Sequence, residues 1–239
     1  MEEEKKHIKE TDSFTAVSHY IKSPIYILKG YLEALFSEDL GELNEKQKNY
    51  IKVCLENVDK VNTTIGGLVR VMEIENGRYE VKKEPVDITK EIKDVVEDNW
   101  VLAKASNAKI FMQTQEEPIF VLTDKEKIKE TLNALLMNAI KYKAQKEGRI
   151  DIRIEKKGEK MLFFIKNNGV SISDEEKEKI FNKFYRTKEA VRVDPNSLGL
   201  ELYICKIVIE ESGGEIWMEK DNEERSSFFF TLPLYKKEN

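Results

Sequence analysis

His19 is the side chain whose type and setting best suit chemistry in this 239-residue sequence. It lies in a segment where apolar residues recur at spacings of three, four or seven, a pattern that predicts one apolar stripe along a helix. The stripe consists of Val17, Ile21, Leu28, Leu32 and Leu35. Because His19 is two residues from both Val17 and Ile21, it points away from the stripe. An outward imidazole can serve as a nucleophile, although an ordinary surface histidine fits this position equally well.

The composition is that of a folded domain with a heavily solvated surface. Charged residues make up 36% of the chain and apolar residues 40%. The formal net charge is −5 and no basic block stands out, which argues against nucleic acid as a partner. No apolar run approaches the roughly 18 residues that span a bilayer, and no secretion signal opens the sequence. We therefore expect no membrane segment, and a cytoplasmic protein or the cytoplasmic part of a membrane-anchored receptor.

Cysteine and histidine are scarce, with two of each in the chain: Cys54, Cys205, His7 and His19. That is too few for a disulfide framework, and the spacing suits no zinc site. Both cysteines fall on apolar faces, so the sequence predicts buried thiols in a reducing compartment.

Two long periodic helices are expected to position His19. The first covers residues 5–36, and the second carries an unbroken stripe from Leu43 to Met72 and ends at Asn76-Gly77. Such a pair predicts an antiparallel hairpin. Two helices bury too little surface alone, so we expect the hairpin to form a four-helix bundle with a second copy, as a homodimer. The alternative is that the hairpin packs on the rest of its own chain.

After Gly77 the pattern changes to short strands mixed with helices. This order predicts an α+β fold in which a mixed sheet carries helices on one face, with domains at 1–77 and 78–239. A capping box at Ser173 and Glu176 predicts a short helix, and residues 191–197 form an expected mobile loop. The expected strands are 78–86, 109–112, 118–122, 149–156, 161–166, 215–220 and 227–234, and the expected helices are 87–105, 123–142 and 198–211.

Five segments in series resemble the sequence boxes of two-component sensor histidine kinases. Residues 18–25 resemble the phosphoacceptor box, 132–142 the asparagine box and 180–186 the phenylalanine box. Residues 198–214 resemble the second glycine box with its helix, and 226–233 the closing strand. The resemblance covers about residues 14–234. It implies a dimerisation and phosphotransfer hairpin followed by a Bergerat-type ATP-binding domain.

The resemblance also implies roles for individual residues. His19 would accept a phosphoryl group from ATP and pass it to an aspartate of a response regulator receiver domain. Asn138 would offer an oxygen to Mg²⁺, a hard cation that prefers oxygen ligands, and Lys141 would reach the phosphates. Ser23 stands where the family places a water-orienting residue. The other expected nucleotide-binding residues are Tyr142, Asn167, Gly169, Phe184, Arg186, Gly199 and Leu200.

The sequence departs from the family along the reaction path. Tyr20 replaces the carboxylate that follows the histidine, and Asn167 replaces the aspartate that binds the adenine amino group. The other departures are Ser171 for a glycine, Ala134 for the first asparagine of its box, and Pro195 and Ser197 for two glycines of the lid. Pro195 has no N–H to donate, and Ser197 disfavours positive φ. We therefore expect a degenerate histidine kinase with weakened or lost ATP binding and poor autophosphorylation.

Three alternatives stay open. The chain could be a fully active sensor histidine kinase, or an ATP-independent histidine phosphotransferase. It could also be a non-catalytic dimeric module that binds a response regulator or another histidine kinase. Substituting His19 with alanine should abolish the first two functions and spare the third.

Overall fold

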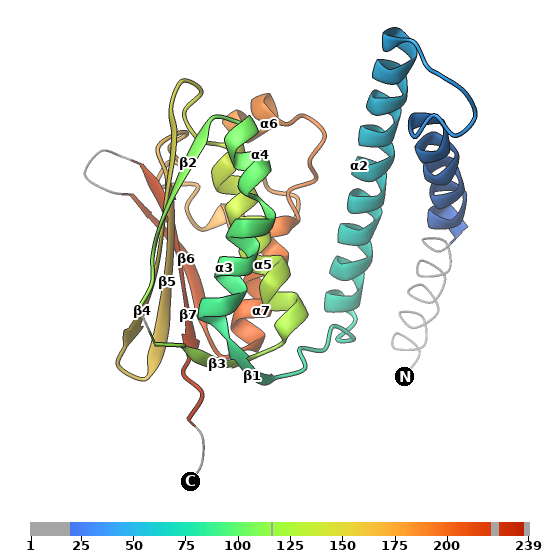
Figure 1. The fold of residues 1–239 in the computed structure, drawn as a ribbon. Coiled ribbons are helices and arrows are strands. Elements are labelled where there is room, and N and C mark those ends of the chain that lie inside the picture. Colours follow the sequence, from blue (N-terminus) through green and yellow to red (C-terminus); the bar gives the residue numbers. More distant parts are fainter. Residues whose placement is uncertain (1–19, 116, 221–224, 237–239) are drawn as a thin grey trace, which may run out of the picture. The chain divides into compact units, whose positions relative to one another are not determined.

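The computed structural model describes residues 20–115, 117–220 and 225–236. His19 therefore lies just outside the described residues. The chain divides into two compact units, Met1–Glu80 and Val81–Asn239, which are described separately (Figure 1). In the described part of the chain, no helix has the length and apolar character needed to cross a bilayer.

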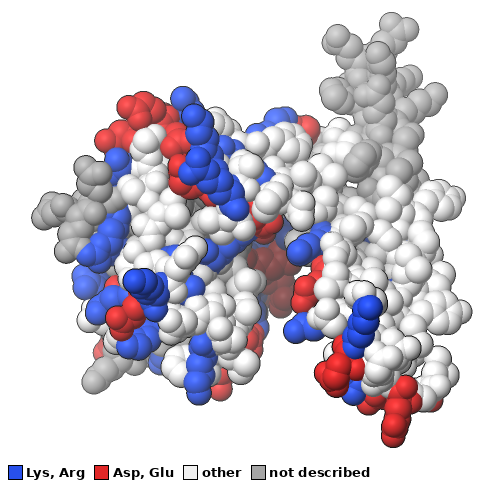
Figure 2. Space-filling view, turned by 90° about the horizontal axis from the view of Figure 1, so that it is seen from above, with Lys and Arg blue, Asp and Glu red and all other residues white. Residues whose placement is uncertain are grey.

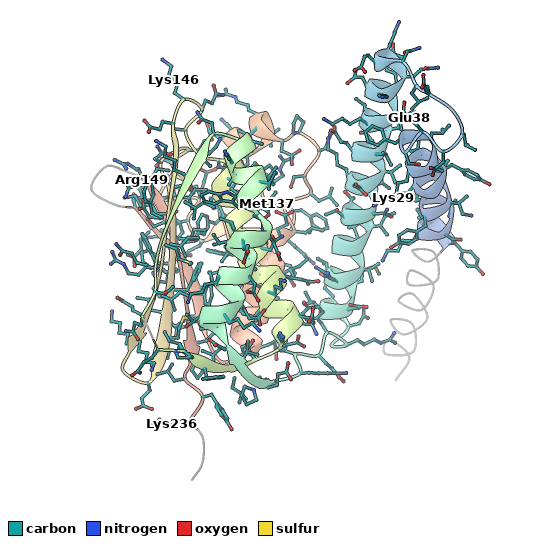
Figure 3. The ribbon with its side chains drawn as sticks, in the orientation of Figure 1. Lys29, Glu38, Met137, Lys146, Arg149 and Lys236 are labelled. Carbon is teal, nitrogen blue, oxygen red and sulfur yellow. The ribbon has the colours of Figure 1, made fainter. Side chains whose placement is uncertain are left out.

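The first unit is a helical hairpin, as predicted. Its first helix is described over residues 20–36, and α2 spans Glu45–Glu75. A capping box starts α2, because the Asn44 side chain accepts from the Gln47 amide and the Gln47 side chain accepts from the Asn44 amide, both at 2.9 Å. Between the helices, Lys29 Nζ lies 2.7 Å from Asp59 Oδ1, and Figure 3 labels Lys29.

The hairpin leaves much of its apolar stripe uncovered. In the protomer, the exposed fraction is 44% for Ile21, 55% for Leu28 and 58% for Tyr50. Figure 2 shows a broad part of the hairpin surface without charged side chains. Cys54, predicted to be buried, is exposed, because the described residues of the hairpin do not cover this part of α2. Single residues of this size are often exposed, but a continuous apolar stripe marks an interaction surface.

The second unit is built on a five-stranded mixed sheet with the order β2-β4-β5-β7-β6. Strand β2 is parallel to β4, and the other neighbouring pairs are antiparallel. Strands β1 and β3 form a separate antiparallel pair. The strands are β1 (Glu84–Asp87), β2 (Ala108–Gln113), β3 (Phe120–Thr123), β4 (Gly148–Lys157), β5 (Lys160–Asn167), β6 (Glu215–Lys220) and β7 (Ser226–Pro233).

Helices cover one face of this sheet, which confirms the predicted α+β architecture (Figure 1). Alternate residues of the strands point into the core, where the rings of Phe163 and Phe230 stack 4.6 Å apart. The helices are α3 (Ile88–Asp98), α4 (Trp100–Ala105), α5 (Lys125–Lys141), α6 (Lys188–Val193), α7 (Glu201–Glu211) and the 3₁₀ helix η1 (Lys179–Phe181).

The single helix predicted over 87–105 is wrong, because the chain breaks at Asn99 into α3 and α4. The Asn99 side chain donates to the carbonyl of Val95 and to Asn133 Oδ1, each at 2.8 Å. An asparagine amide that bonds to the preceding turn competes with helix continuation.

The segment predicted as a loop over 191–197 is partly helical. Helix α6 runs to Val193 and is capped by Thr187, whose hydroxyl accepts from the Ala190 amide at 3.1 Å. The predicted box at Ser173 does not start an α-helix, because the Ser173 hydroxyl donates to the Glu176 carboxylate instead of accepting from the backbone. A turn and η1 follow.

Two predicted boundaries also shift. Helix α7 starts at Glu201 rather than at 198, because Gly199 has φ +70, which a right-handed helix cannot continue. The strand predicted over 78–86 is reduced to β1, which begins at Glu84.

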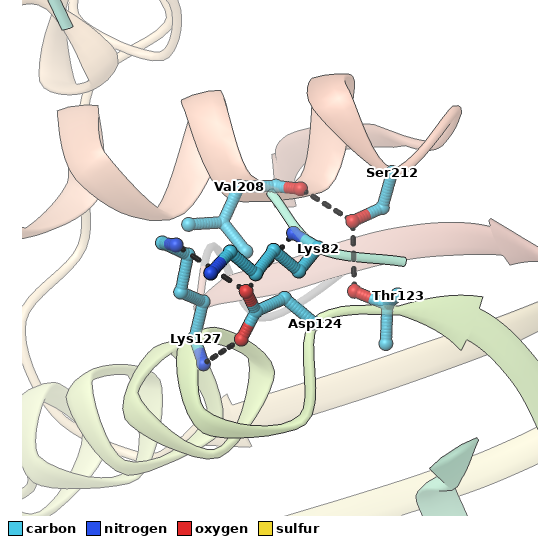
Figure 4. A network of polar contacts seen from close by, with 6 residues as sticks. All are labelled: Lys82, Thr123, Asp124, Lys127, Val208 and Ser212. Carbon is cyan, nitrogen blue, oxygen red and sulfur yellow. Dashed lines mark hydrogen bonds and ion pairs between the residues drawn. The ribbon is translucent and has the colours of Figure 1, made fainter. Parts of the chain in front are cut away.

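A polar network fixes the start of α5 (Figure 4). Asp124 caps the helix by accepting from the Lys127 amide at 3.1 Å, and it also accepts from the Lys82 amide at 3.1 Å. Beside it, the Thr123 hydroxyl lies 2.7 Å from the Ser212 hydroxyl, which donates to the carbonyl of Val208. The network ties α5 to the chain that enters the second unit and to the end of α7.

Candidate functional site

A pocket opens in the second unit where the end of α5, the end of β5 and the start of α7 meet. With the solvent at its mouth it encloses about 770 Å³. Its walls combine apolar side chains with a few polar groups, the composition typical of small-molecule sites. The apolar lining includes Val170, Ile172, Ile180, Leu202 and Phe228, and the polar lining includes Asn138, Tyr142, Asn167, Arg186, Thr187, Ser197, Glu201 and Ser226.

Asn167 presents a neutral acceptor to this pocket from the last position of β5. The side chain is buried, and its Nδ2 donates to the carbonyl of Tyr142 at 3.0 Å. Within the described residues, Oδ1 accepts no hydrogen bond. The atom is not completely buried, so a ligand can reach it. Asn167 lines the pocket, and since Nδ2 is bonded to Tyr142, we infer that Oδ1 is the atom it offers there. The amide orientation is fixed, and one oxygen is available to an N–H of a ligand.

Gly169 allows the backbone to come close at the same place. A Cβ at this residue would lie 1.8 Å from the carbonyl oxygen of Tyr142. That oxygen also accepts from the Val170 amide at 3.0 Å. Only glycine fits here, and the loop after β5 is thereby held against the end of α5.

Lys141, in the last turn of α5, is paired with residues 188–197, the segment called the lid below. Its Nζ lies 2.5 Å from Asp194 Oδ2, and both side chains are partly buried. Burial works to raise the pKa of the Asp194 carboxyl, but the hydrogen bond and charge of Lys141, the Asn196 amide and Arg186 outweigh it and hold the pKa below its usual value. The carboxylate is therefore ionised at neutral pH.

Arg186 is also engaged by the lid. Its guanidinium donates to the carbonyls of Ala190 at 2.8 Å, Pro195 at 3.2 Å and Asp194. Lys141 and Arg186 thus each have partners among residues 190–195.

Gly199 lets the chain turn between the lid and α7. Its φ is +70, and a Cβ there would lie 2.5 Å from the carbonyl oxygen of Tyr185. The Phe184 amide donates to the Gly199 carbonyl at 3.0 Å. The Phe184 ring itself is half-exposed, whereas Leu200 is buried in the core.

The structure brings together part of the predicted nucleotide-binding set. Asn138, Tyr142, Asn167, Arg186 and Gly199 line the pocket. Lys141, Gly169, Phe184 and Leu200 are not part of its lining.

The two residues predicted for phosphotransfer belong to the hairpin. His19 is outside the described residues, and Ser23 is exposed on the first helix.

Sequence reasoning missed two acidic residues at the pocket. Glu201 lines it, and Asp194 pairs with Lys141. A carboxylate in the first turn of a helix is a recognisable signal for Glu201. Nothing in the sequence links Asp194 to a lysine 53 positions away.

The described residues contain no group of three or more His, Cys, Asp or Glu side chains that could hold a metal ion. The oxygen of the Asn138 amide is the ligand that the sequence predicts. Since Mg²⁺ in phosphate sites commonly has one or two protein ligands and takes the rest from phosphate and water, these residues fit a metal that arrives with a nucleotide.

Comparison with known proteins matches both units. Residues 9–77 match the family model of the His Kinase A (phospho-acceptor) domain, and residues 123–236 match that of the histidine kinase-, DNA gyrase B- and HSP90-like ATPases. The sensor histidine kinase WalK of Bacillus subtilis is 26% identical over 239 residues, which cover 99% of this chain and 38% of WalK.

Solved structures agree. The catalytic domain of histidine kinase ThkA is 31% identical, with a TM-score of 0.56 over 63% of this chain and 95% of that chain. ThkA in complex with the response regulator protein TrrA is 28% identical, with a TM-score of 0.61 over 98% of this chain and 66% of that chain. The chain belongs to the two-component sensor histidine kinase family, and it comprises a phosphoacceptor domain and an ATPase domain. It spans little more than a third of the length of WalK.

Proposed function

We propose that this chain is a histidine kinase core that binds adenine nucleotide weakly and phosphorylates His19 slowly. The observation that carries the proposal is Asn167, whose fixed amide offers the pocket one neutral oxygen. An adenine amino group can donate to that oxygen while the ring packs against the apolar wall that includes Ile172, Ile180 and Phe228.

The same observation supports weak binding. A hydrogen bond to a charged acceptor contributes about 1.5–3 kcal/mol, against roughly 0.5–1.5 kcal/mol for a neutral one. Loss of the carboxylate at this position therefore costs about 1–2 kcal/mol, or roughly a factor of 5–30 in affinity. Pro195 adds to the loss, because it has no N–H with which the lid could bind a phosphate oxygen.

The reaction would proceed on the hairpin. A neutral nitrogen of the His19 imidazole attacks the γ-phosphorus of ATP, the new N–P bond forms, and ADP leaves with the bond to the γ-phosphorus broken. Mg²⁺, bound through Asn138 and the phosphates, would neutralise charge on the nucleotide. Tyr20 stands where a carboxylate would accept the imidazole proton, and the absence of that base slows the step.

Two partners follow from the proposal. A second copy would cover the exposed stripe of the hairpin, so that the protein acts as a homodimer. A response regulator receiver domain would accept the phosphoryl group on an aspartate. The structure of ThkA with a response regulator supports this second partner. Another histidine kinase is a further candidate partner.

The experiment is incubation of the protein with γ-labelled ATP and Mg²⁺, followed by localisation of the label. We expect slow labelling that is lost in His19→Ala and strongly reduced in Asn138→Ala. Asn133→Ala, on the exposed side of the same helix, is the matched control and should keep the wild-type rate. Fast, stoichiometric labelling at micromolar ATP would contradict the weak-binding part of the proposal. Label that persists in Asn138→Ala would contradict the site.

A second candidate is ATP-independent phosphotransfer through His19. Ser23 favours it, because its hydroxyl is exposed on the first helix four residues after the histidine, where it could orient water. Incubation with a phosphorylated response regulator distinguishes the two: phosphate loss that needs His19 but not nucleotide supports the second candidate. If neither reaction needs His19, the non-catalytic binding module is favoured.

A further inference from the structure

Two carboxylates lie beside sources of positive charge that an anionic ligand of this pocket would otherwise reach: Glu201 lines the pocket, and Asp194 pairs with Lys141 outside its lining. Asp194 approaches from the lid and Glu201 from the first turn of α7. Asp194 lies beside the ammonium group of Lys141, and Glu201 lies at the N-terminus of α7.

Asp194 forms an ion pair with Lys141. Its Oδ2 is 2.5 Å from Lys141 Nζ, while Oδ1 accepts from the Asn196 amide at 3.2 Å. The Arg186 guanidinium holds the same segment by donating to the carbonyl of Asp194 itself. The flanking residues on both elements, Tyr142 on one side and Ala190 and Ser197 on the other, line the pocket. To bind Lys141, a phosphate group would have to displace the partly buried, ionised carboxylate of Asp194.

Glu201 occupies the helix end. It lies in the first turn of α7 and lines the pocket. The N-terminus of a helix carries a partial positive charge that commonly binds phosphate. Among the described residues, the exposed Glu201 carboxylate makes no capping hydrogen bond, but its charge lowers the positive potential at this helix end and repels a second anion at short range.

We propose that Asp194 and Glu201 substitute for the phosphates of a nucleotide, so that this pocket binds an uncharged adenine nucleoside more tightly than the triphosphate. The inference rests on the proposed function, because it assumes that the same pocket holds adenine through Asn167. ATP then competes with the protein's own lid, and release of Asp194 from Lys141 accompanies its binding.

Calorimetric titration of the full chain with adenosine, and separately with ATP and Mg²⁺, tests the inference. In the wild type we expect adenosine to bind more tightly than ATP. Asp194→Asn and Glu201→Gln each keep the shape of the side chain and remove its charge. Each should tighten ATP binding by about tenfold, the double variant should tighten it further, and adenosine affinity should stay within about twofold.

Two matched controls exist, one that breaks an ion pair with a lysine of α5 and one on α7. Asp98→Asn breaks an exposed pair of 3.1 Å with Lys129 of α5, and Glu211→Gln removes an exposed charge at the far end of α7. Neither should change the affinity for either ligand.

Each of the other possible results of the titrations contradicts a specific part of the inference or of the proposed function. If adenosine binds but ATP affinity is unchanged in both acid variants, the substitution of phosphates is wrong and the adenine site stands. If the variants tighten adenosine and ATP equally, the carboxylates act on the fold rather than on phosphate, and the inference is overturned. If no variant binds adenosine, both the inference and the nucleotide-binding part of the proposed function fail.

Discussion

At the scale of single residues, the neutral amide of Asn167 is matched to its surroundings. Its Nδ2 donates to the Tyr142 carbonyl at 3.0 Å, and a carboxylate at the same place could not donate unless it were protonated. Asn167→Asp should therefore not restore a family-like site without a cost in stability. The ionised side chain would be buried beside a carbonyl oxygen, so burial and this neighbour raise its pKa in the folded state.

We predict that Asn167→Asp lowers the free energy of unfolding by about 1–3 kcal/mol at pH 7. Because the folded-state pKa is raised, the variant retains stability in acid and loses it as pH rises through that pKa. Urea unfolding at pH 4.5 and pH 7 measures this. The fluorescence of Trp100 and Trp217 reports on the second unit, since both lie in it. An equal deficit at the two pH values would contradict the role of the Tyr142 carbonyl.

Cys205 gives a second prediction at this scale. Burial raises the pKa of its thiol to about 12, and the S–H contacts the carbonyl of Thr131 at 4.0 Å. In a Cys54→Ser background, we expect no alkylation by iodoacetamide at pH 8 until denaturant unfolds the chain. Mass spectrometry of the native protein gives the readout, and rapid labelling of Cys205 without denaturant would contradict its burial.

Residue types revealed only part of the site. Asn138, Asn167 and Arg186 were found through their resemblance to sequence boxes, and all three line the pocket. The engagement of Lys141 and Arg186 by the lid was not predictable, because it depends on how residues 188–195 fold back over the pocket. The sequence showed the loss of glycines in the lid but not what the replacements contact.

At the scale of elements, α5 depends on its cap. Burial works to raise the pKa of Asp124, but the amides of Lys127 and Lys82 and the charge of Lys127 outweigh it and hold the pKa below its usual value. We predict that Asp124→Ala lowers the free energy of unfolding by about 1–2 kcal/mol at pH 7, and that Asp124→Asn, which still caps the helix, costs less.

The pH dependence follows from the lowered pKa. The contribution of Asp124 is complete above its unfolded-state pKa of about 3.9 and is lost as pH falls through the folded-state value. Wild type and Asp124→Ala should therefore approach one another in stability as the pH falls below the unfolded-state value of about 3.9. Tryptophan fluorescence in urea, taken from pH 7 downward, follows the difference, and a gap that stays constant would show that the charge of Asp124 plays no part.

Elements with clear periodicity and caps were predictable, and those decided by local side-chain bonds were not. Helix α5 spans Lys125–Lys141, one or two residues inside the predicted range 123–142 at each end. The break at Asn99 arises from a bond to Asn133, which the sequence pattern cannot show. Helix α6 was missed because its six residues are too few for a periodic signal and its Thr187 cap lies in a segment of mixed polarity.

At the scale of the whole molecule, the uncovered stripe of the hairpin predicts a dimer. We expect Leu28→Asp, at 55% exposure on the stripe, to convert the protein to a monomer, because an ionised side chain would be desolvated at the interface. Leu40→Asp is the control. Leu40 is 76% exposed but lies in the turn between the helices, so that variant should stay dimeric. Sedimentation velocity gives the masses, and a monomeric wild type at roughly 100 μM would refute the homodimer.

The dependence of His19 labelling on ATP concentration tests the central claim most directly. If the pocket holds adenine through a neutral amide while its own carboxylates occupy the phosphate end, the initial rate should rise almost linearly with MgATP up to about 1 mM, the upper end of ordinary Michaelis constants. Asp194→Asn should bend this curve towards saturation at lower concentrations. A wild-type rate that saturates at micromolar ATP, with no change in Asp194→Asn, would contradict the account.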